Sequence, residues 1–93
     1  MIIGLLVLEI HFPQARSLKD KRQVLRRIKD RVRQKHNVAV AELDFQDKWQ
    51  RARLGLVTIS SDRSVVDNTL NRIRDEVEST DGGQVLGADI QYL

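Results

Sequence analysis

Basic side chains recur at helical spacing between residues 16 and 36. At about 100° per residue, five of them fall on one flank of a helix, in the order Lys19, Arg22, Arg26, Lys29 and Arg33. At 1.5 Å of rise per residue, this basic stripe is roughly 20 Å long. Such cations neutralise phosphates, and Arg16 and Arg51 would extend the patch. The stripe therefore predicts RNA binding through phosphates, with steep salt dependence and weak sequence preference.

The net charge of the chain is divided unevenly. Residues 16–36 hold ten Lys or Arg and two Asp, a net charge of +8, whereas the whole chain carries +3. The remainder therefore carries −5, and a split of this size favours an acidic partner. The same charges also fit a solvated helix that is offset internally, by Arg26 with Asp30 or by acidic residues of a second helix, namely Asp67, Asp75, Glu76 and Glu78. The sequence leaves both interpretations open.

Few side chains are suited to catalysis or metal binding. His11 and His36 are far apart and lack a partner motif, so we expect both to be structural or solvated. Glu42 and Asp44 are two apart on one face of a predicted strand, where they could bind a hard cation or act as paired acids. Protection of an edge strand by charge is the favoured interpretation. With no cysteine and no phosphate-loop, dinucleotide or zinc motif, we expect no enzyme activity, metal or cofactor.

The single tryptophan lies in a polar loop at residues 46–51. Trp49 is flanked by Lys48 and Arg51, and Trp and Arg are enriched at interaction hot spots. It could equally fold over a sheet edge and cap the core. RNA-recognition modules stack bases on aromatic side chains of their central strands. The chain has four aromatic residues in all, so base stacking on the sheet face is disfavoured.

The stripe must be positioned by a long amphipathic helix over residues 17–36. Ser17 and Asp20 have the spacing of a capping box, and the interior contains no Gly or Pro. Its apolar face consists of Leu18, Val24, Leu25, Ile28 and Val32. Lys21 falls inside this apolar arc, so its ammonium must extend to the surface or find a partner.

A second helix and four strands account for the remaining pattern. The helix is predicted over residues 63–78, with Ser61 or Asp62 as its cap and an apolar stripe of Val66, Leu70, Ile73 and Val77. Strands are predicted over residues 2–12, 38–45, 52–60 and 84–93, the last with a bulge at Gly87. The apolar first strand is too short to span a bilayer and lacks a basic leader, and cysteine is absent. We therefore expect a cytoplasmic protein without membrane association.

The order βαββαβ predicts an α+β, ferredoxin-like domain over residues 1–93. It has a four-stranded antiparallel sheet with two helices on one face, and its first and third strands are central. Both central strands are aliphatic on both faces, so the face without helices is predicted to be an interface. A homodimer is the favoured assembly, and its contact residues would include Ile3, Leu5, Val7, Val57 and Ile59.

Several segments resemble the YlxP-like family of small bacterial proteins of unknown function. SLKDKR at residues 17–22, Asn37-Val38, Ala41-Glu42 and the segment WQRA at residues 49–52 carry most of the resemblance, which covers essentially the whole chain. It implies a ferredoxin-like fold and no catalytic residues. Its members are typically encoded near a transcription elongation factor, a translation initiation factor and ribosome-binding factor A. That neighbourhood implies, by association, a role around ribosome maturation or translation, with ribosomal RNA or the small ribosomal subunit as partner.

The alternative function is a protein-interaction or structural module. It would assemble through the apolar face of the sheet and have no nucleic-acid role, and the basic helix would serve solubility or acidic protein partners.

Overall fold

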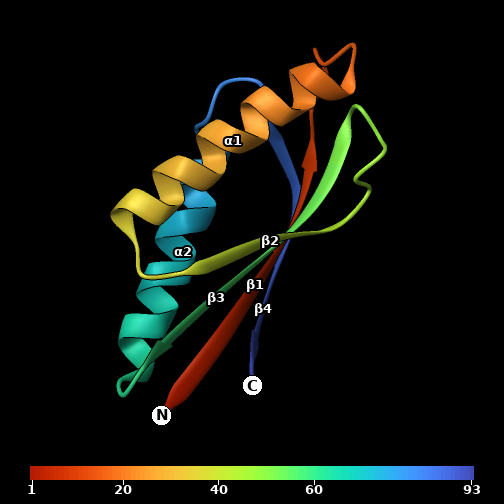
Figure 1. Ribbon diagram of the computed structural model, residues 1–93. Coiled ribbons are helices and arrows are strands. Elements are labelled where there is room, and N and C mark those ends of the chain that lie inside the picture. The colour runs from red at the N-terminus through yellow and green to blue at the C-terminus, as the bar shows by residue number, and fades with distance from the viewer.

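The computed structural model describes residues 1–93 as an antiparallel sheet covered on one face by two helices (Figure 1). The elements are β1 (Ile2–His11), α1 (Leu18–Lys35), β2 (Ala39–Asp44), β3 (Arg51–Ser60), α2 (Arg63–Glu78) and β4 (Gln84–Tyr92). The strand order in the sheet is β2-β3-β1-β4, so the first and third strands are central and β2 lies at an edge. The predicted ferredoxin-like arrangement is confirmed.

Capping bonds fix the starts of both helices. The Asp20 backbone N–H donates to Ser17 Oγ at 3.1 Å, and the Asp20 carboxylate accepts a hydrogen bond from the Arg16 backbone N–H at 3.0 Å. Asp62 caps α2 by accepting the Ser64 backbone N–H at 2.9 Å. Hydrogen bonds from Ser64 hold the pKa of Asp62 below its ordinary value. Neither helix has the length and hydropathy needed to cross a bilayer.

The core lies between the helices and the facing side of the sheet. Alternate residues of β1 face the helices and are fully buried, as the side-chain period of a strand requires; these are Leu6, Leu8 and Ile10. The predicted stripe of α2 is buried throughout, and α1 contributes Leu25, Ile28 and Val32. A Cβ at Gly4 would overlap Val66 and lie 2.9 Å from Leu70 Cδ1, so α2 can approach β1 closely only because residue 4 is glycine.

Register shifts interrupt both edge strands. Glu42 pairs with Leu54, which faces the helices, whereas Asp44 pairs with Arg53 on the open face. The prediction that both carboxylates share one face is therefore wrong, because the extra residue between them inverts the alternation of side chains. In β4 the shift lies between Val85 and Gly87, so the residue without a partner is Leu86, one position before the bulge predicted at Gly87.

The two ends of the chain lie close together. The Leu93 N–H donates to the Ile3 carbonyl at 2.9 Å, which ties the last residue to the first strand. Both ends lie at the opposite end of the elongated molecule from the loop that joins β2 to β3 (Figure 1).

Candidate functional site

Four cations of the basic stripe line a groove between α1 and β2. The groove has a volume of about 480 Å³, and its lining residues are Arg22, Leu25, Arg26, Lys29, Asp30, Arg33 and Glu42. Lys19, the fifth member of the stripe, is exposed in the first turn of α1, and Arg16 is exposed just before it. All the lining residues but one lie on α1, and β2 contributes Glu42.

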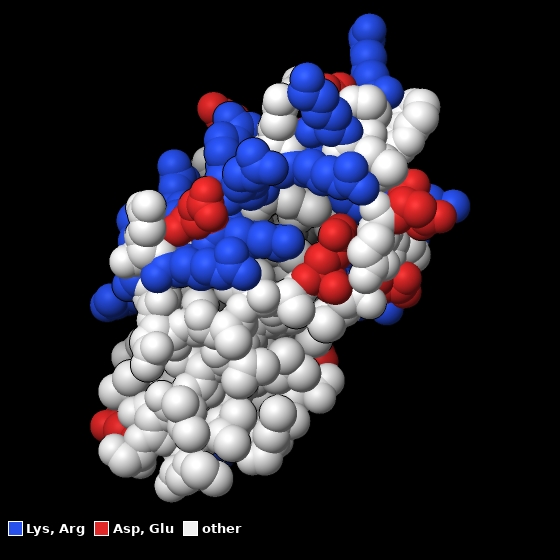
Figure 2. Space-filling model, in the orientation of Figure 1, with Lys and Arg blue, Asp and Glu red and all other residues white.

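None of the five stripe side chains forms an ion pair with a carboxylate. The acidic residues of α2 do not neutralise it: Glu76, for example, contacts His36 Nε2 at 3.0 Å instead. Asp30 does not pair with Arg26, although the two are four residues apart. Figure 2, in the orientation of Figure 1, shows the Lys and Arg side chains gathered on the half of the molecule where α1 lies, whereas the other half of the visible surface carries little charge. Arg33 Nη2 donates a long hydrogen bond to the Val40 carbonyl, at 3.4 Å, and the other four stripe cations are available to an external anion.

A buried ammonium group connects α1 to β2 and to the following loop. Lys21 Nζ donates to the Phe45 carbonyl at 2.7 Å and to the Arg51 carbonyl at 2.9 Å, and it lies 3.1 Å from Glu42 Oε2. Two hydrogen bonds to carbonyls and an ion pair with Glu42 offset the cost of removing the charge from water. Glu42 Oε2 itself is buried and makes no hydrogen bond. Lys21 is 1% exposed, so it is a structural cation that no ligand can reach. The sequence indicated that Lys21 needed a partner but not which one.

The loop between β2 and β3 is tied to the start of α1 by further bonds. Gln50 Nε2 donates to the Ala15 carbonyl at 3.1 Å and more weakly to that of Pro13 at 3.4 Å. The Gln50 carbonyl accepts the Phe12 N–H at 2.9 Å. At the other end of the loop, Lys21 holds the carbonyl of Phe45, whose φ of 65° is a left-handed conformation that is uncommon for a bulky residue. Hydrogen bonds therefore hold the loop at both ends.

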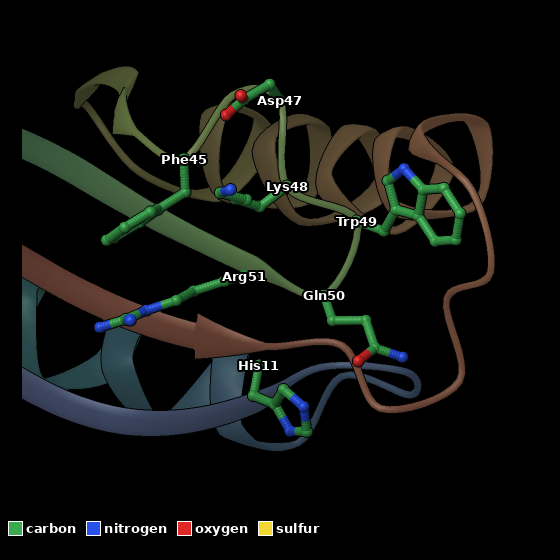
Figure 3. Close-up of a pocket in the computed structure, with 7 residues that line it drawn as sticks. All are labelled: His11, Phe45, Asp47, Lys48, Trp49, Gln50 and Arg51. Atoms are coloured by element: carbon green, nitrogen blue, oxygen red, sulfur yellow. The ribbon is translucent and has the colours of Figure 1, made fainter.

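This loop forms one wall of a hollow of about 540 Å³ (Figure 3). The lining residues are His11, Phe45, Asp47, Lys48, Trp49, Gln50 and Arg51. Trp49 is 53% exposed and lies outside the hydrophobic core, so it does not act as a core cap. Arg51 pairs with His11 on the open face of the sheet and lies 4.3 Å from the centre of the Phe45 ring. Arg51 therefore lines the same hollow as Trp49 and does not extend the basic stripe.

The open face of the sheet is divided into a charged part and an apolar part. Arg53 hydrogen-bonds Glu9 and contacts Asp44 at 3.4 Å, and the bond to Glu9 raises the pKa of Arg53. Beyond these residues the face is aliphatic, with Ile59 51% exposed. The partly buried residues of this apolar part are Ile3, Leu5, Val7 and Val57. No element of the chain covers it (Figure 1).

The two histidines lie in different surroundings. His11 Nδ1 is 3.4 Å from Gln84 Oε1 at one end of the sheet, and His36 contacts Glu76 at the end of α1. No group of three or more His, Asp or Glu side chains could hold a metal ion.

Comparison with known proteins gives a family. The sequence model of the family described as "Protein of unknown function (DUF503)" matches residues 3–90. Over 78 residues the chain is 40% identical to the "Uncharacterized protein YlxP" of Bacillus subtilis (strain 168), an alignment that covers 84% of this chain and 85% of that protein.

Proposed function

The chain belongs to the DUF503 family, and we propose that it is an RNA-binding protein that holds phosphates in the groove between α1 and β2. The observation that carries this proposal is the absence of any carboxylate partner for the five stripe cations. An unpaired row of Lys and Arg beside a groove is the usual electrostatic arrangement for a polyanion. We further propose that the RNA is ribosomal and that the protein acts in the cytoplasm around ribosome maturation or translation, as the resemblance implies.

The proposal makes a quantitative statement about salt. Each phosphate that a cation neutralises releases a counterion, and for single strands the logarithm of affinity falls with that of salt by about 0.7 per contact. The four groove cations therefore give a slope of about −3. Contacts to phosphates carry no base information, so affinity should vary little among unstructured sequences.

The test compares two triple variants with the same change of charge. One replaces Arg22, Arg26 and Arg33 by Glu, and the control replaces three cations on the other flank of α1, Arg27, Arg31 and Lys35. Binding of a short fluorescent oligoribonucleotide is followed by anisotropy at several salt concentrations, with circular dichroism as the check of folding. The stripe variant should lose measurable binding, and the control should lose only part of it. Equal losses, or unchanged affinity in the stripe variant, would refute the proposed groove.

Association with the ribosome is tested separately. Tagged protein should migrate with small ribosomal subunits in a sucrose gradient at low salt and leave them as salt rises, because the contacts are electrostatic. Sedimentation at the top of the gradient at every salt concentration would contradict the ribosomal assignment.

As a second candidate function, we propose an assembly module that forms a homodimer through the apolar part of the open sheet face. Ile59 and Leu43 are 51% and 48% exposed on the face that no helix covers, and aliphatic patches of this kind usually mark interfaces. Light scattering at tens of micromolar should give twice the monomer mass, and Val57→Lys should return it to the monomer mass. A monomer mass for the unaltered chain would refute the dimer.

A further inference from the structure

We propose that the hollow beside Trp49 is a stacking site for one unpaired nucleobase. This inference rests on the proposed RNA binding and specifies its substrate as a single strand. It adds to the phosphate contacts of the groove a second kind of contact, between the indole ring and the flat face of a base.

Trp49 is exposed on a loop that other side chains hold in place. It is a large aromatic side chain, 53% exposed, on a loop whose backbone is fixed on both sides. Lys21 holds the carbonyls of Phe45 and Arg51, and Gln50 is bonded to the segment before α1. Because the backbone is already fixed, only the side-chain rotamers of Trp49 remain to be ordered on binding. The loop therefore presents a ready surface, and truncating Trp49 should leave the core intact.

The side chains that line the hollow have the chemistry that a nucleotide needs. Lys48 is a cation without an ion pair, whereas Arg51 lies 3.9 Å from the Glu9 carboxylate, and Asp47 is the one carboxylate of the lining. The amide nitrogen of Gln50 donates to backbone carbonyls, and its amide oxygen has no hydrogen-bond partner. A base needs a π-face, hydrogen-bonding groups at its edge and a cation for its phosphate, and these are present together here.

Trp49, and not Phe45, offers the free aromatic face. The Phe45 ring is already engaged, with the guanidinium groups of Arg51 and Arg53 at 4.3 and 5.2 Å from its centre. Figure 3 shows Trp49 at the other end of the loop from Phe45, with its ring pointing away from the side chains of Phe45 and Arg51. A base that stacks on the free indole face would therefore lie at this end of the hollow.

The hollow lies near the start of the groove. Lys21, which binds the loop, is followed directly by Arg22, the first cation of the groove. Gln50 is bonded to Ala15 and Pro13, immediately before α1. The hollow thus adjoins the end of the helix where the basic stripe begins. A single strand along the stripe would reach Trp49 at that end, whereas a duplex keeps its bases stacked inside and offers none.

The experiment uses the fluorescence of Trp49, the only tryptophan of the chain. A short oligouridylate is titrated into the full-length protein, and the same strand annealed to oligoadenylate serves as the comparison. Stacking should quench the fluorescence with the single strand and leave it unchanged with the duplex. Equal quenching by both forms would overturn the inference, because the bases of a duplex cannot reach the ring.

Three variants separate stacking from other contacts. Trp49→Ala should weaken single-strand affinity about tenfold or more, since base–aromatic stacking contributes at this level. Trp49→Phe keeps a π-face and should retain most of the affinity, whereas Trp49→Leu keeps only apolar bulk and should bind as weakly as Trp49→Ala. Full affinity in Trp49→Leu, in a protein with unchanged circular dichroism, would overturn the inference.

The outcomes distinguish this inference from the function on which it rests. If RNA binds with the expected salt slope while Trp49→Ala has no effect, the phosphate-binding groove is supported and the stacking site is refuted. If neither RNA form binds, and the triple variants show no difference, both fall together.

Discussion

Replacing Lys21 by Met removes the charge that joins α1 to β2 and to the loop bearing Trp49. Met keeps the apolar length of the side chain, so the change is confined to the ammonium group. Two carbonyls then lose their donor, those of Phe45 and Arg51, and the Glu42 carboxylate loses its cation. Lys21 is 1% exposed and the Glu42 side chain 18% exposed, but Glu42 Oε2, the oxygen that faces the ammonium, is buried, so water cannot take the place of the ammonium there.

The cost follows from these contacts. Removing one partner of a buried ion pair destabilises a protein by about 3 to 5 kcal/mol, and we expect the lower value because Glu42 remains partly hydrated. A loss of about 3 kcal/mol is a large part of the 5 to 15 kcal/mol typical of a small domain. It corresponds to a fall in Tm of roughly 12 to 24 °C for a chain of this size.

Urea unfolding followed by circular dichroism measures this difference, and Lys19→Met is the matched control. Lys19 is exposed and forms no ion pair, so its replacement should change the free energy of unfolding by less than about 0.5 kcal/mol. The double variant Lys21→Met, Glu42→Leu should recover part of the loss, because no buried carboxylate is then left without a cation. If Lys21→Met proves no less stable than Lys19→Met, the assignment of Lys21 as the connection between these elements is refuted.

Two further predictions concern the core and a helix cap. Gly4→Ala should lower the free energy of unfolding by about 1 to 3 kcal/mol in urea, because its Cβ would overlap Val66, and an unchanged midpoint would contradict this close packing. Asp62→Ala should lower Tm at neutral pH, because the folded-state pKa of Asp62 is depressed and the carboxylate form stabilises the fold. The stabilisation is present above the unfolded pKa and is lost as pH falls through the folded value, so thermal melts should show the difference narrowing below about pH 4; a constant difference down to lower pH would contradict it.

The fold could be predicted from the sequence because its signals are local. Ser17 and Asp20 mark the start of α1. For α2 the sequence allowed Ser61 or Asp62 as the cap, and the hydrogen bond from the Ser64 N–H identifies Asp62. Apolar periodicity separated strands from helices, and the order βαββαβ with right-handed crossovers predicted that β1 and β3 are central. These signals lie within single elements or in their order along the chain, so no knowledge of long-range contacts was needed.

The candidate site was only partly predictable, because it depends on contacts between distant segments. Lys21 was out of place in the apolar arc of α1, yet its carbonyl partners lie 24 and 30 residues further along the chain. A single extra residue in β2 sends Asp44 to the opposite face from Glu42, and no residue type marks such a shift. The exposure of Trp49 likewise depends on where its loop is anchored, so the choice between interaction anchor and core cap required the structure.

The hydrogen bond between Leu93 and Ile3 has a consequence for chain topology. Because the ends meet on the sheet, a short peptide could join them into a backbone ring without distorting any element. Closing the chain would restrict the unfolded ensemble, as a long-range cross-link does, and would leave the folded state as it is. The molecule is 42 Å long, and the ends lie away from the loop that carries Trp49 (Figure 1). A circular form would therefore be more resistant to unfolding, with both the groove and the hollow still open.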